Sequence, residues 1–432
     1  MPFEQNAAPP RKIAVIGGGI SGLGAADLLA GHHRVTLIEA EPRLGGHART
    51  VMAGKRGDQS VDTGFIVFNR VNYPHIVKLF ERLGVPITES SMSFGVSLDA
   101  GRWEYCLSDL NGLLATRRNV LDPRFMAMLR DIFRFNARAL DLARPGMSIR
   151  DLLAQLGTGK WFRDRYLLPF SGAIWSTPAK GILDFPADAL LAFFKNHALM
   201  GATGQHQWYT VQGGSREYVT RLTRSLEARG TAIRIGTPVQ AVRRDALGAR
   251  VKLHGQDWES FDDVIFATHS DVTLRLLQDA NGVERAALSA VKYQPNRAVL
   301  HRDTGVMPRR RQCWSSWVYT EDGAGDDRIG LSYWMNSLQP IPQDDPMFVT
   351  LNGARAIREE LIYDEVSFAH PVYTREALEA QGVIRAINGA NNTWFCGAWM
   401  KNGFHEDGLA SAVDVVEAMA LRDQAGFVVA AE

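Results

Sequence analysis

Three glycines and a glutamate near the N-terminus have the types and spacing of a dinucleotide-binding site. Gly17, Gly19 and Gly22 form a GxGxxG pattern. The first glycine of such a pattern permits a tight turn, the second lets a pyrophosphate approach the backbone, and the third lets a helix pack closely on a strand. Glu39 follows at a distance where a carboxylate can bind the hydroxyls of an adenosine ribose. That carboxylate disfavours a 2′-phosphate, so the pattern argues against NADP.

A second group of chemically capable residues lies near the C-terminus. His405, Glu406 and Asp407 stand in a row before Gly408, which is predicted to open the last helix. The histidine could pass a proton near neutral pH, and either carboxylate could act as a base. The alternative is that the acidic residues only cap the helix. Adjacent side chains rarely point at one ion and no HxxxH spacing accompanies them, so no metal site is expected.

The elements around the first glycine pattern are those that it needs. Residues 13–16 form a short β-branched run, residues 23–30 have a helical composition, and residues 34–39 form a second strand-like run. Together they predict a βαβ unit with parallel strands. Two further stretches, 231–244 and 262–269, are predicted to form strands that end beside this unit.

The chain alternates between two kinds of sequence. A nucleotide-binding domain is expected to comprise residues 12–67, 210–290 and 388–425, because glycine turns, short strands and helices alternate there. Residues 68–209 and 291–387 are richer in aromatic residues and contain no second glycine-rich nucleotide turn. The prediction is an α/β fold in which a discontinuous Rossmann-type domain carries an inserted α+β substrate domain.

Composition excludes several classes of protein. The 432 residues are 46% hydrophobic and 22% charged, with a net charge of +1, so nucleic-acid binding driven by overall charge is not expected. Cys106, Cys313 and Cys396 are odd in number and far apart, which argues against a disulfide framework and fits a reducing compartment. The first ten residues do not resemble a secretory signal, and no apolar run reaches about 20 residues. A cytoplasmic protein is expected, with peripheral contact at the inner membrane face left open.

The loop after Glu39 carries a family resemblance. Arg43 begins an RxGG turn, and VDTGF follows at 61–65. This arrangement resembles the flavin amine oxidase and phytoene desaturase superfamily, which implies FAD as cofactor and an amine oxidase-like two-domain architecture. No redox cysteine pair and no second GxGxxG is present, so the organic substrate is expected to reduce the flavin directly. The residues expected to hold FAD are Gly17, Gly19, Gly22, Glu39, Arg43, Gly45, Gly46, Thr63, Gly64, Phe65, Val239, Gly397, Gly408 and Leu409.

The aromatic segments favour an apolar substrate. The residues expected to contact it are Asn69, Tyr73, Trp175, Trp317 and Tyr333. For each aromatic residue the alternative is core packing, and for Asn69 it is anchoring of its own loop. Many amine oxidases carry a lysine near the flavin, whereas the comparable region here has Asn296 and Arg297 and no lysine. That difference weakens an amine oxidase assignment.

A closer resemblance rests on longer strings of sequence. GGHART, GFIVFNRVNYPHIVKLFERLGV, MSFGVSLD, SGAIWSTP and GFHEDGLASA resemble the N-terminal flavoprotein half of plant cyclopropane fatty acid synthases and their bacterial stand-alone relatives. His47 departs from the wider superfamily, where an arginine is common. The resemblance implies dehydrogenation, desaturation or isomerisation of a fatty-acyl lipid, with a fatty-acid methyltransferase as a possible partner. The alternatives are an amine or polyamine oxidase, and a non-catalytic flavin-bound subunit that presents lipid to that methyltransferase.

One predicted helix has the pattern of a surface-active segment. Phe125, Met128, Leu129, Ile132, Phe133 and Leu140 are predicted to share one apolar stripe. Arg130, Arg134 and Arg138 recur at helical spacing on another face. The pattern favours a helix that covers the substrate domain. The alternative is a basic amphipathic helix on a membrane surface.

Overall fold

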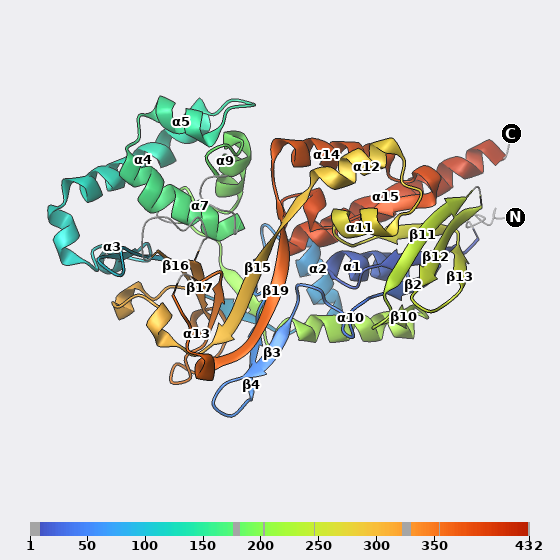
Figure 1. The fold of residues 1–432 in the computed structure, drawn as a ribbon, viewed down its shortest axis with the longest axis horizontal. Coiled ribbons are helices and arrows are strands. Elements are labelled where there is room, and N and C mark those ends of the chain that lie inside the picture. The colour runs from blue at the N-terminus through green and yellow to red at the C-terminus, as the bar shows by residue number, and fades with distance from the viewer. Residues whose placement is uncertain are drawn as a thin grey trace, which may run out of the picture.

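The computed structural model describes residues 9–175, 182–201, 204–245, 247–321, 330–353 and 355–430, without the side chains of Trp175 and of residues 424–430. Figure 1 shows a nucleotide-binding part at one end of the molecule, with both chain ends near it, and a helical lobe at the other end. Two long strands, β15 and β19, run between the two parts.

A five-stranded parallel sheet organises the nucleotide-binding part. Its strands, in spatial order, are β10 (Ala232–Arg234), β2 (Arg34–Ile38), β1 (Lys12–Ile16), β14 (Asp263–Phe266) and β20 (Thr393–Phe395). Val15 lies between Leu37 of β2 and Ile265 of β14. The sheet therefore joins three distant segments of the chain, and the predicted α/β fold with a Rossmann-type sheet is confirmed.

Both faces of this sheet are covered. Ile13 and Val15 belong to a core shared with Leu23 of the first helix, whereas Ala14 and Ile16 belong to a second core on the opposite side. Alternation of side chains along the strand explains why a strand buried on both faces has apolar residues at successive positions, as β1 has over residues 13–16. The helices of this part are α1 (Ile20–Leu29), α2 (Pro74–Leu83), α10 (Arg216–Ala228), α11 (Ser270–Leu276), α12 (Gly282–Ala290), α14 (Arg375–Ile387) and α15 (His405–Ala430).

The stretch 231–244 behaves differently from the expectation. Only β10 joins the parallel sheet, whereas β11 (Val239–Asp245) forms a separate antiparallel sheet with β12 (Gly248–Leu253) and β13 (Trp258–Phe261). The chain turns between β10 and β11 at Gly236, whose φ of 61° is left-handed. The expectation of strands beside the first unit is therefore wrong for β11.

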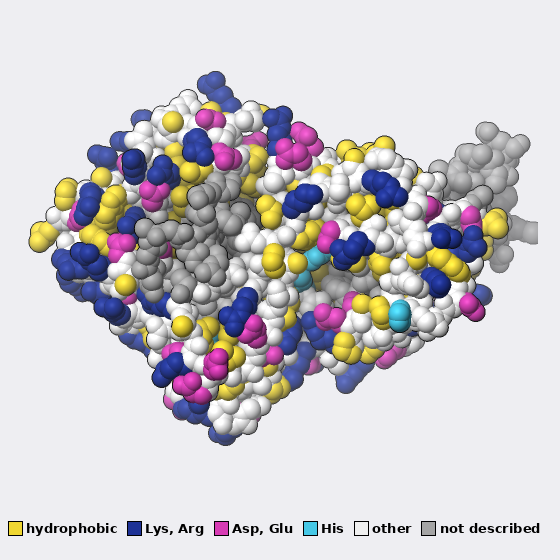
Figure 2. Space-filling view, viewed as in Figure 1, with side chains coloured by type: hydrophobic (Ala, Val, Ile, Leu, Met, Phe, Trp, Pro, Cys, Tyr) yellow, Lys and Arg dark blue, Asp and Glu magenta, His cyan; other side chains and the backbone are white. Residues whose placement is uncertain are grey.

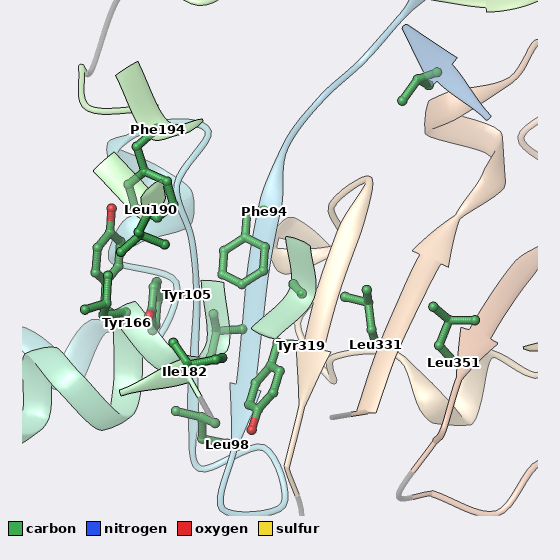
Figure 3. Close-up of a cluster of buried hydrophobic side chains, with 14 of the residues drawn as sticks. Phe94, Leu98, Tyr105, Tyr166, Ile182, Leu190, Phe194, Tyr319, Leu331 and Leu351 are labelled. Carbon is green, nitrogen blue, oxygen red and sulfur yellow. The ribbon is translucent and has the colours of Figure 1, made fainter. Parts of the chain in front are cut away.

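A seven-stranded mixed sheet forms the substrate part. Its spatial order is β19 (Ile362–Val372), β15 (Lys292–His301), β18 (Phe348–Leu351), β17 (Gly330–Trp334), β16 (Trp317–Thr320), β7 (Phe94–Leu98) and β8 (Trp103–Cys106). The helices of this part are α3 (Leu110–Leu113), α4 (Pro123–Leu142), α5 (Ile149–Leu156), α6 (Lys160–Phe162), α7 (Leu168–Trp175), α9 (Ala187–Asn196) and α13 (Met335–Leu338). Figure 3 shows how sheet and helices share one apolar core, with Phe94, Tyr319 and Leu331 from strands and Tyr166, Leu190 and Phe194 from the helical segments.

Smaller strands complete the connection between the two parts. β3 (Thr50–Ala53) pairs with β4 (Gln59–Asp62), and β9 (Trp208–Val211) lies between β5 (Val67–Asn69) and β6 (Ile87–Ser90). Packing does not follow the expected segment boundaries throughout. Helices α2 and α14 fall within 68–209 and 291–387, yet their apolar faces belong to the two cores of the nucleotide-binding part.

Helix α4 divides its apolar residues between two sides. Phe125 and Met128 are buried, and Leu129 and Ile132 pack against the same core, whereas Phe133 is 71% exposed. Leu140 is also exposed. The predicted single stripe is wrong. The later residues Phe135 and Ala139 are buried on the same side as Phe125, whereas Phe133 and Leu140 lie on a neighbouring face of the helix. Among the described helices, none has the length and hydropathy to cross a bilayer.

Candidate active site

The GxGxxG glycines are required for different reasons. Gly17 has a φ of 108°, and its N–H donates to Ile38 O at 2.8 Å. A Cβ on Gly22 would lie 1.8 Å from Gly17 O, so this position must lack a side chain. A Cβ on Gly19 would meet nothing within 4 Å. The fold therefore explains Gly17 and Gly22, whereas Gly19 leaves open space for a group that approaches the start of α1.

A second glycine turn lies directly against the first. Gly45 donates its N–H to Gly18 O at 2.8 Å, and a Cβ on Gly46 would lie 3.1 Å from Gly19 Cα. Arg43 braces this turn by donating to Gly46 O at 2.9 Å. Gly19 also caps α1 without a side-chain hydrogen bond, so backbone N–H groups of the first turn are available to a phosphate.

Glu39 lies beside the glycine cradle formed by the two adjoining turns of Gly17–Gly19 and Gly45–Gly46. One carboxylate oxygen accepts from Gly18 N at 2.5 Å, and the other accepts from Glu41 N at 2.8 Å. The segment that leads to Val239 runs alongside, since Thr237 donates its N–H to Glu39 O at 3.0 Å. These contacts orient a half-buried carboxylate with remaining lone pairs, as the ribose end of a dinucleotide site requires.

The VDTGF turn is packed on the RxGG loop. A Cβ on Gly64 would lie 1.9 Å from His47 O, and Phe65 donates its N–H to the same oxygen at 2.9 Å. Thr63 is buried, and its N–H donates to Arg49 O at 2.9 Å. The two predicted cofactor segments therefore form one continuous surface.

The C-terminal segment closes onto the first helix. Gly397 donates to Ser411 Oγ at 2.8 Å, and a Cβ on Gly408 would lie 2.7 Å from Ile20 Cγ2. Leu409 lies over Gly24, where a Cβ would approach its Cδ1 at 2.4 Å. Helix α15 begins at His405, three residues before the predicted start at Gly408. The first helical hydrogen bond runs from Gly408 N to Phe404 O, so the N–H groups ahead of that bond belong to the three residues predicted to precede the helix.

His405 is half-buried and is held in a neutral state. Its ring stacks on Phe65 with centroids 4.0 Å apart, and its Nε2 lies 2.7 Å from the Tyr218 hydroxyl. Burial lowers the pKa of His405 to about 3. An imidazole with this pKa positions a neighbouring group better than it stores a proton at neutral pH.

Glu406 caps a neighbouring helix. Its oxygens accept from the backbone N–H groups of His75 and Ile76 at 2.9 and 3.0 Å, and one also lies 2.7 Å from His75 Nδ1. These contacts occupy the carboxylate at the N-terminus of α2, where a negative charge is stabilised. Glu406 therefore has an evident structural role.

Asp407 is the best suited of the three to proton transfer. It accepts from Phe404 N at 2.9 Å, and burial raises its pKa to about 6. Burial also raises the pKa of Tyr73, with a further contribution from Asp407. A carboxylate that titrates near neutral pH is suited to take a proton, and Tyr73 is a predicted substrate contact close to it.

The predicted substrate residues fall into two groups. Asn69 is buried and accepts from Val71 N and Asn72 N at 3.0 and 2.7 Å, so it anchors its own loop. Trp317 and Tyr333 pair across β16 and β17 as half-buried rings in a T-shaped contact 5.4 Å apart. The side chain of Trp175 lies outside the described residues.

A cluster of half-buried histidines was not predicted as a unit. The ring of His47 stacks on Phe368 at 4.7 Å and lies 5.6 and 6.0 Å from the rings of His370 and His269. Burial lowers the pKa of all three imidazoles. Asn296 lies 2.9 Å from His370 Nδ1. Only His47 stood out in the sequence, because it follows the RxGG turn. His269 and His370 lie in distant segments that no local pattern connects to it. Figure 2 shows a recess beside β15 and β19 with a histidine at its edge.

Among the described residues, no group of histidine, cysteine and carboxylate side chains has the arrangement of a metal site. The site instead combines a double glycine cradle, a carboxylate at the ribose end and the N-terminus of α15. A Cβ on Gly19 would contact no protein atom within 4 Å, so packing within the protein does not require glycine at this position. The close approach of a dinucleotide phosphate to the backbone does require it, and the cradle therefore fits a dinucleotide. FAD is the cofactor, and the fold and the site define an FAD-dependent oxidoreductase.

Comparison with known proteins agrees with this class. The family model of flavin containing amine oxidoreductases matches residues 20–301, so the chain belongs to that family. An L-amino-acid oxidase of Pseudechis australis is 44% identical over 54 residues, which are 12% of this chain and 10% of that protein. Polyamine oxidase 5 of Oryza sativa subsp. japonica is 36% identical over 114 residues, 25% of this chain and 22% of that protein. The matches thus cover less than a quarter of these relatives' length.

Solved structures share the fold over nearly the whole chain. A fatty acid isomerase from P. acnes that produces CLA superposes with a TM-score of 0.67 at 16% identity, covering 94% of this chain and 98% of that one. Cyclohexylamine oxidase from Brevibacterium oxydans superposes with a TM-score of 0.69 at 15% identity, covering 95% and 100%. At these identities the similarity concerns the fold.

Proposed function

We propose that this protein is an FAD-dependent oxidoreductase that removes hydrogen from an apolar, fatty-acyl substrate. FAD, when bound, supplies the acceptor for a hydride and its two electrons. Loss of that hydride from one carbon and of a proton from its neighbour leaves a carbon–carbon double bond, so the protein must provide a base for the proton.

The observation that carries the proposal is the group of aromatic side chains on the substrate sheet. Trp317 stands in register with Phe94 of β7 on one side and Tyr333 of β17 on the other. Trp317 and Tyr333 are half-buried and border the large apolar core. Burial raises the pKa of Tyr333, and no charged group contributes to that shift. An aromatic surface without charged groups favours binding of a hydrocarbon chain, because each buried methylene contributes about 0.8 kcal/mol to binding.

Asp407 is the base in this proposal. Its raised pKa places its titration close to neutral pH. His405 and Glu406 position the surrounding segments, the first through Tyr218 and Phe65 and the second through the N-terminus of α2.

One further observation supports a lipid substrate over an amine, and the fold is compatible with either. The strand β15 carries Asn296 and Arg297 where a lysine would be expected of many amine oxidases, and Arg297 pairs with Glu365 on the exposed side of the sheet. The fold is shared with a fatty acid isomerase as well as with amine oxidases, so it accommodates both classes. We also propose the closer relation to the flavoprotein half of cyclopropane fatty acid synthases, with a fatty-acid methyltransferase as partner.

Anaerobic mixing of the FAD-loaded protein with candidate substrates tests the proposal. Phospholipids with unsaturated acyl chains should bleach the flavin absorbance, whereas putrescine and cyclohexylamine should not. Bleaching by an amine alone would establish the amine oxidase alternative. Lipid binding without bleaching would establish the non-catalytic, lipid-presenting alternative.

The Asp407→Asn variant tests the proposed base. It should bind FAD and lipid normally but slow bleaching at least about a hundredfold, the range for loss of a general base. Asp414→Asn is the matched control, because Asp414 lies further along α15 and its exposed carboxylate pairs with Lys401. Equal bleaching rates in the two variants would exclude Asp407 as the base.

A further inference from the structure

Exposed apolar side chains concentrate on one end of the substrate part. Of the fifteen large hydrophobic side chains exposed among the described residues, seven lie between residues 107 and 140. We name these seven the lobe patch, comprising Leu107, Leu110, Val120, Leu121, Met126, Phe133 and Leu140. Leu121 is 86% exposed and Leu110 is 76% exposed. Figure 2 shows hydrophobic and basic side chains interspersed at the left end of the molecule, over α3 and α4 of Figure 1.

Helix α4 contributes a continuous outward stripe to this patch. Met126, Arg130, Phe133, Ala137 and Leu140 are all exposed and recur at spacings of three and four. That spacing places them on one face of a helix. Since the opposite face supplies residues to the apolar core, α4 is apolar on both sides. Folding explains only the inner side.

Cations dominate the charge around the patch. Six arginines between residues 102 and 138 are exposed, namely Arg102, Arg117, Arg118, Arg124, Arg130 and Arg138. Two nearby carboxylates are buried, and of these Glu104 pairs with Arg310 and Asp131 lies beside Arg130. Asp109 and Asp141 are exposed, so the exposed arginines outnumber the exposed carboxylates. The exposed face is therefore both apolar and positive.

A depression within the patch has the chemistry of an anion site. It has a volume of about 460 Å³ and is lined by Arg102, Trp103, Arg118, Leu121, Asp122, Pro123 and Arg124. Arg124 donates a hydrogen bond to the Asp122 carboxylate at 2.7 Å. Asp122 therefore does not neutralise the positive charges of Arg102 and Arg118. A phosphate could bind these arginines while Leu121 beside it enters an apolar phase.

We infer that the lobe patch docks the protein on an anionic phospholipid surface, with headgroup phosphates at Arg102 and Arg118 and with Leu121, Phe133 and Leu110 among the acyl chains. This combination of cations and exposed hydrophobic side chains is what interfacial binding requires. A second copy of the chain would place arginines opposite arginines. Soluble phosphate would use the arginines but not the apolar residues. The inference rests on the surface alone and stands whether or not the substrate is a lipid.

Vesicle flotation tests the inference. The FAD-loaded protein should float with vesicles of phosphatidylcholine and phosphatidylglycerol in equal parts, and should remain free with phosphatidylcholine alone. Leu121→Ser and Phe133→Ser should each weaken partitioning about tenfold, because they remove the apolar contribution. Arg118→Gln should weaken it about fivefold. All three positions are exposed, so these variants should keep the thermal stability of the wild type.

Two control variants carry the same changes at the opposite end of the molecule. Leu247→Ser replaces a leucine that is 91% exposed between β11 and β12, and Arg250→Gln replaces an exposed arginine of β12. Both should partition like the wild type. Equal effects of Leu121→Ser and Leu247→Ser would overturn the inference, as would absence of flotation with the anionic vesicles.

Two further measurements separate other occupants. Inorganic phosphate at the ionic strength of a chloride control should not displace the protein more than chloride does, and specific displacement with no effect of Phe133→Ser would assign the patch to a soluble phosphate. Light scattering should give the same mass for the wild type and Phe133→Ser. A dimer that Phe133→Ser dissociates, together with failure to float, would assign the patch to a second copy.

Discussion

Glu406 accepts the backbone N–H of Ile76 at 3.0 Å, although the two residues are 330 positions apart. The first turn of α15 thereby caps the first turn of α2. Since α2 packs with the nucleotide-binding core and α15 with α1, this hydrogen bond helps to hold the region between Tyr73 and Asp407 together. A carboxylate whose position in the chain suits it to catalysis thus has a structural partner.

Removal of the Glu406 carboxylate should cost stability. We expect Glu406→Ala to lower the free energy of unfolding by about 1–2 kcal/mol, as loss of a helix cap does. Urea denaturation measures the change. Glu376→Ala is the control, because Glu376 is an exposed first-turn residue of α14, and it should change stability by less than about 0.5 kcal/mol. Full stability of Glu406→Ala together with lost turnover would contradict the capping role.

Two glycines of the cradle should respond differently to alanine. Gly19→Ala should fold normally, because its Cβ meets nothing within 4 Å and its φ is −75°, but FAD binding should weaken at least about tenfold. Gly22→Ala should destabilise the protein, because its Cβ would lie 1.8 Å from Gly17 O. Thermal unfolding without cofactor and FAD titration measure the two effects. Unchanged FAD affinity in Gly19→Ala would show that the phosphates bind elsewhere.

His301 should make stability depend on pH. Its Nδ1 accepts from Asp303 N at 3.1 Å, so its Nε2 carries the proton and donates to Thr350 Oγ1 at 2.8 Å. Burial lowers the pKa of His301 from 6.5 to about 4. Below pH 6.5 the unfolded chain binds a proton that the folded imidazole does not, so the stabilisation is complete above pH 6.5 and is lost as pH falls toward 4.

The size of this dependence is about 3 kcal/mol for His301. His301→Asn keeps an acceptor for Asp303 N but does not titrate, so its stability should fall less than that of the wild type between pH 7 and pH 4. Urea denaturation at a series of pH values measures the difference. Parallel curves for the two proteins would show that His301 is not the titrating group.

The ion pair between Arg49 and Asp364 should stabilise the junction of the two parts. Both side chains are about one-fifth exposed, and two Arg49–Asp364 hydrogen bonds of 2.5 and 3.0 Å connect the RxGG loop to β19. A double-mutant cycle with alanine should give a coupling energy of about 1–3 kcal/mol. The control pair Arg375 and Glu379 is 83% and 66% exposed and should couple by less than about 0.5 kcal/mol. Equal coupling in the two pairs would contradict the role of Arg49.

The local parts of the nucleotide site were determined by the sequence alone. The glycine pattern, the β-branched runs around it and Glu39 are close in the chain, and turn chemistry and strand periodicity act over such short distances. The α/β class and the cofactor could therefore be predicted. The exposure of Phe133 and Leu140 on α4 could not be predicted, because which side of a helix is buried depends on the elements packed against it.

Tertiary structure decided the roles of the candidate side chains. His405, Glu406 and Asp407 are neighbours in the chain, yet His405 stacks on Phe65, Glu406 caps α2 and Asp407 is half-buried with a raised pKa. The cluster of His47, His269 and His370 is assembled from three separate segments. Burial and hydrogen-bond partners set the pKa of an ionisable group, and both are properties of contacts between distant segments that no local pattern encodes.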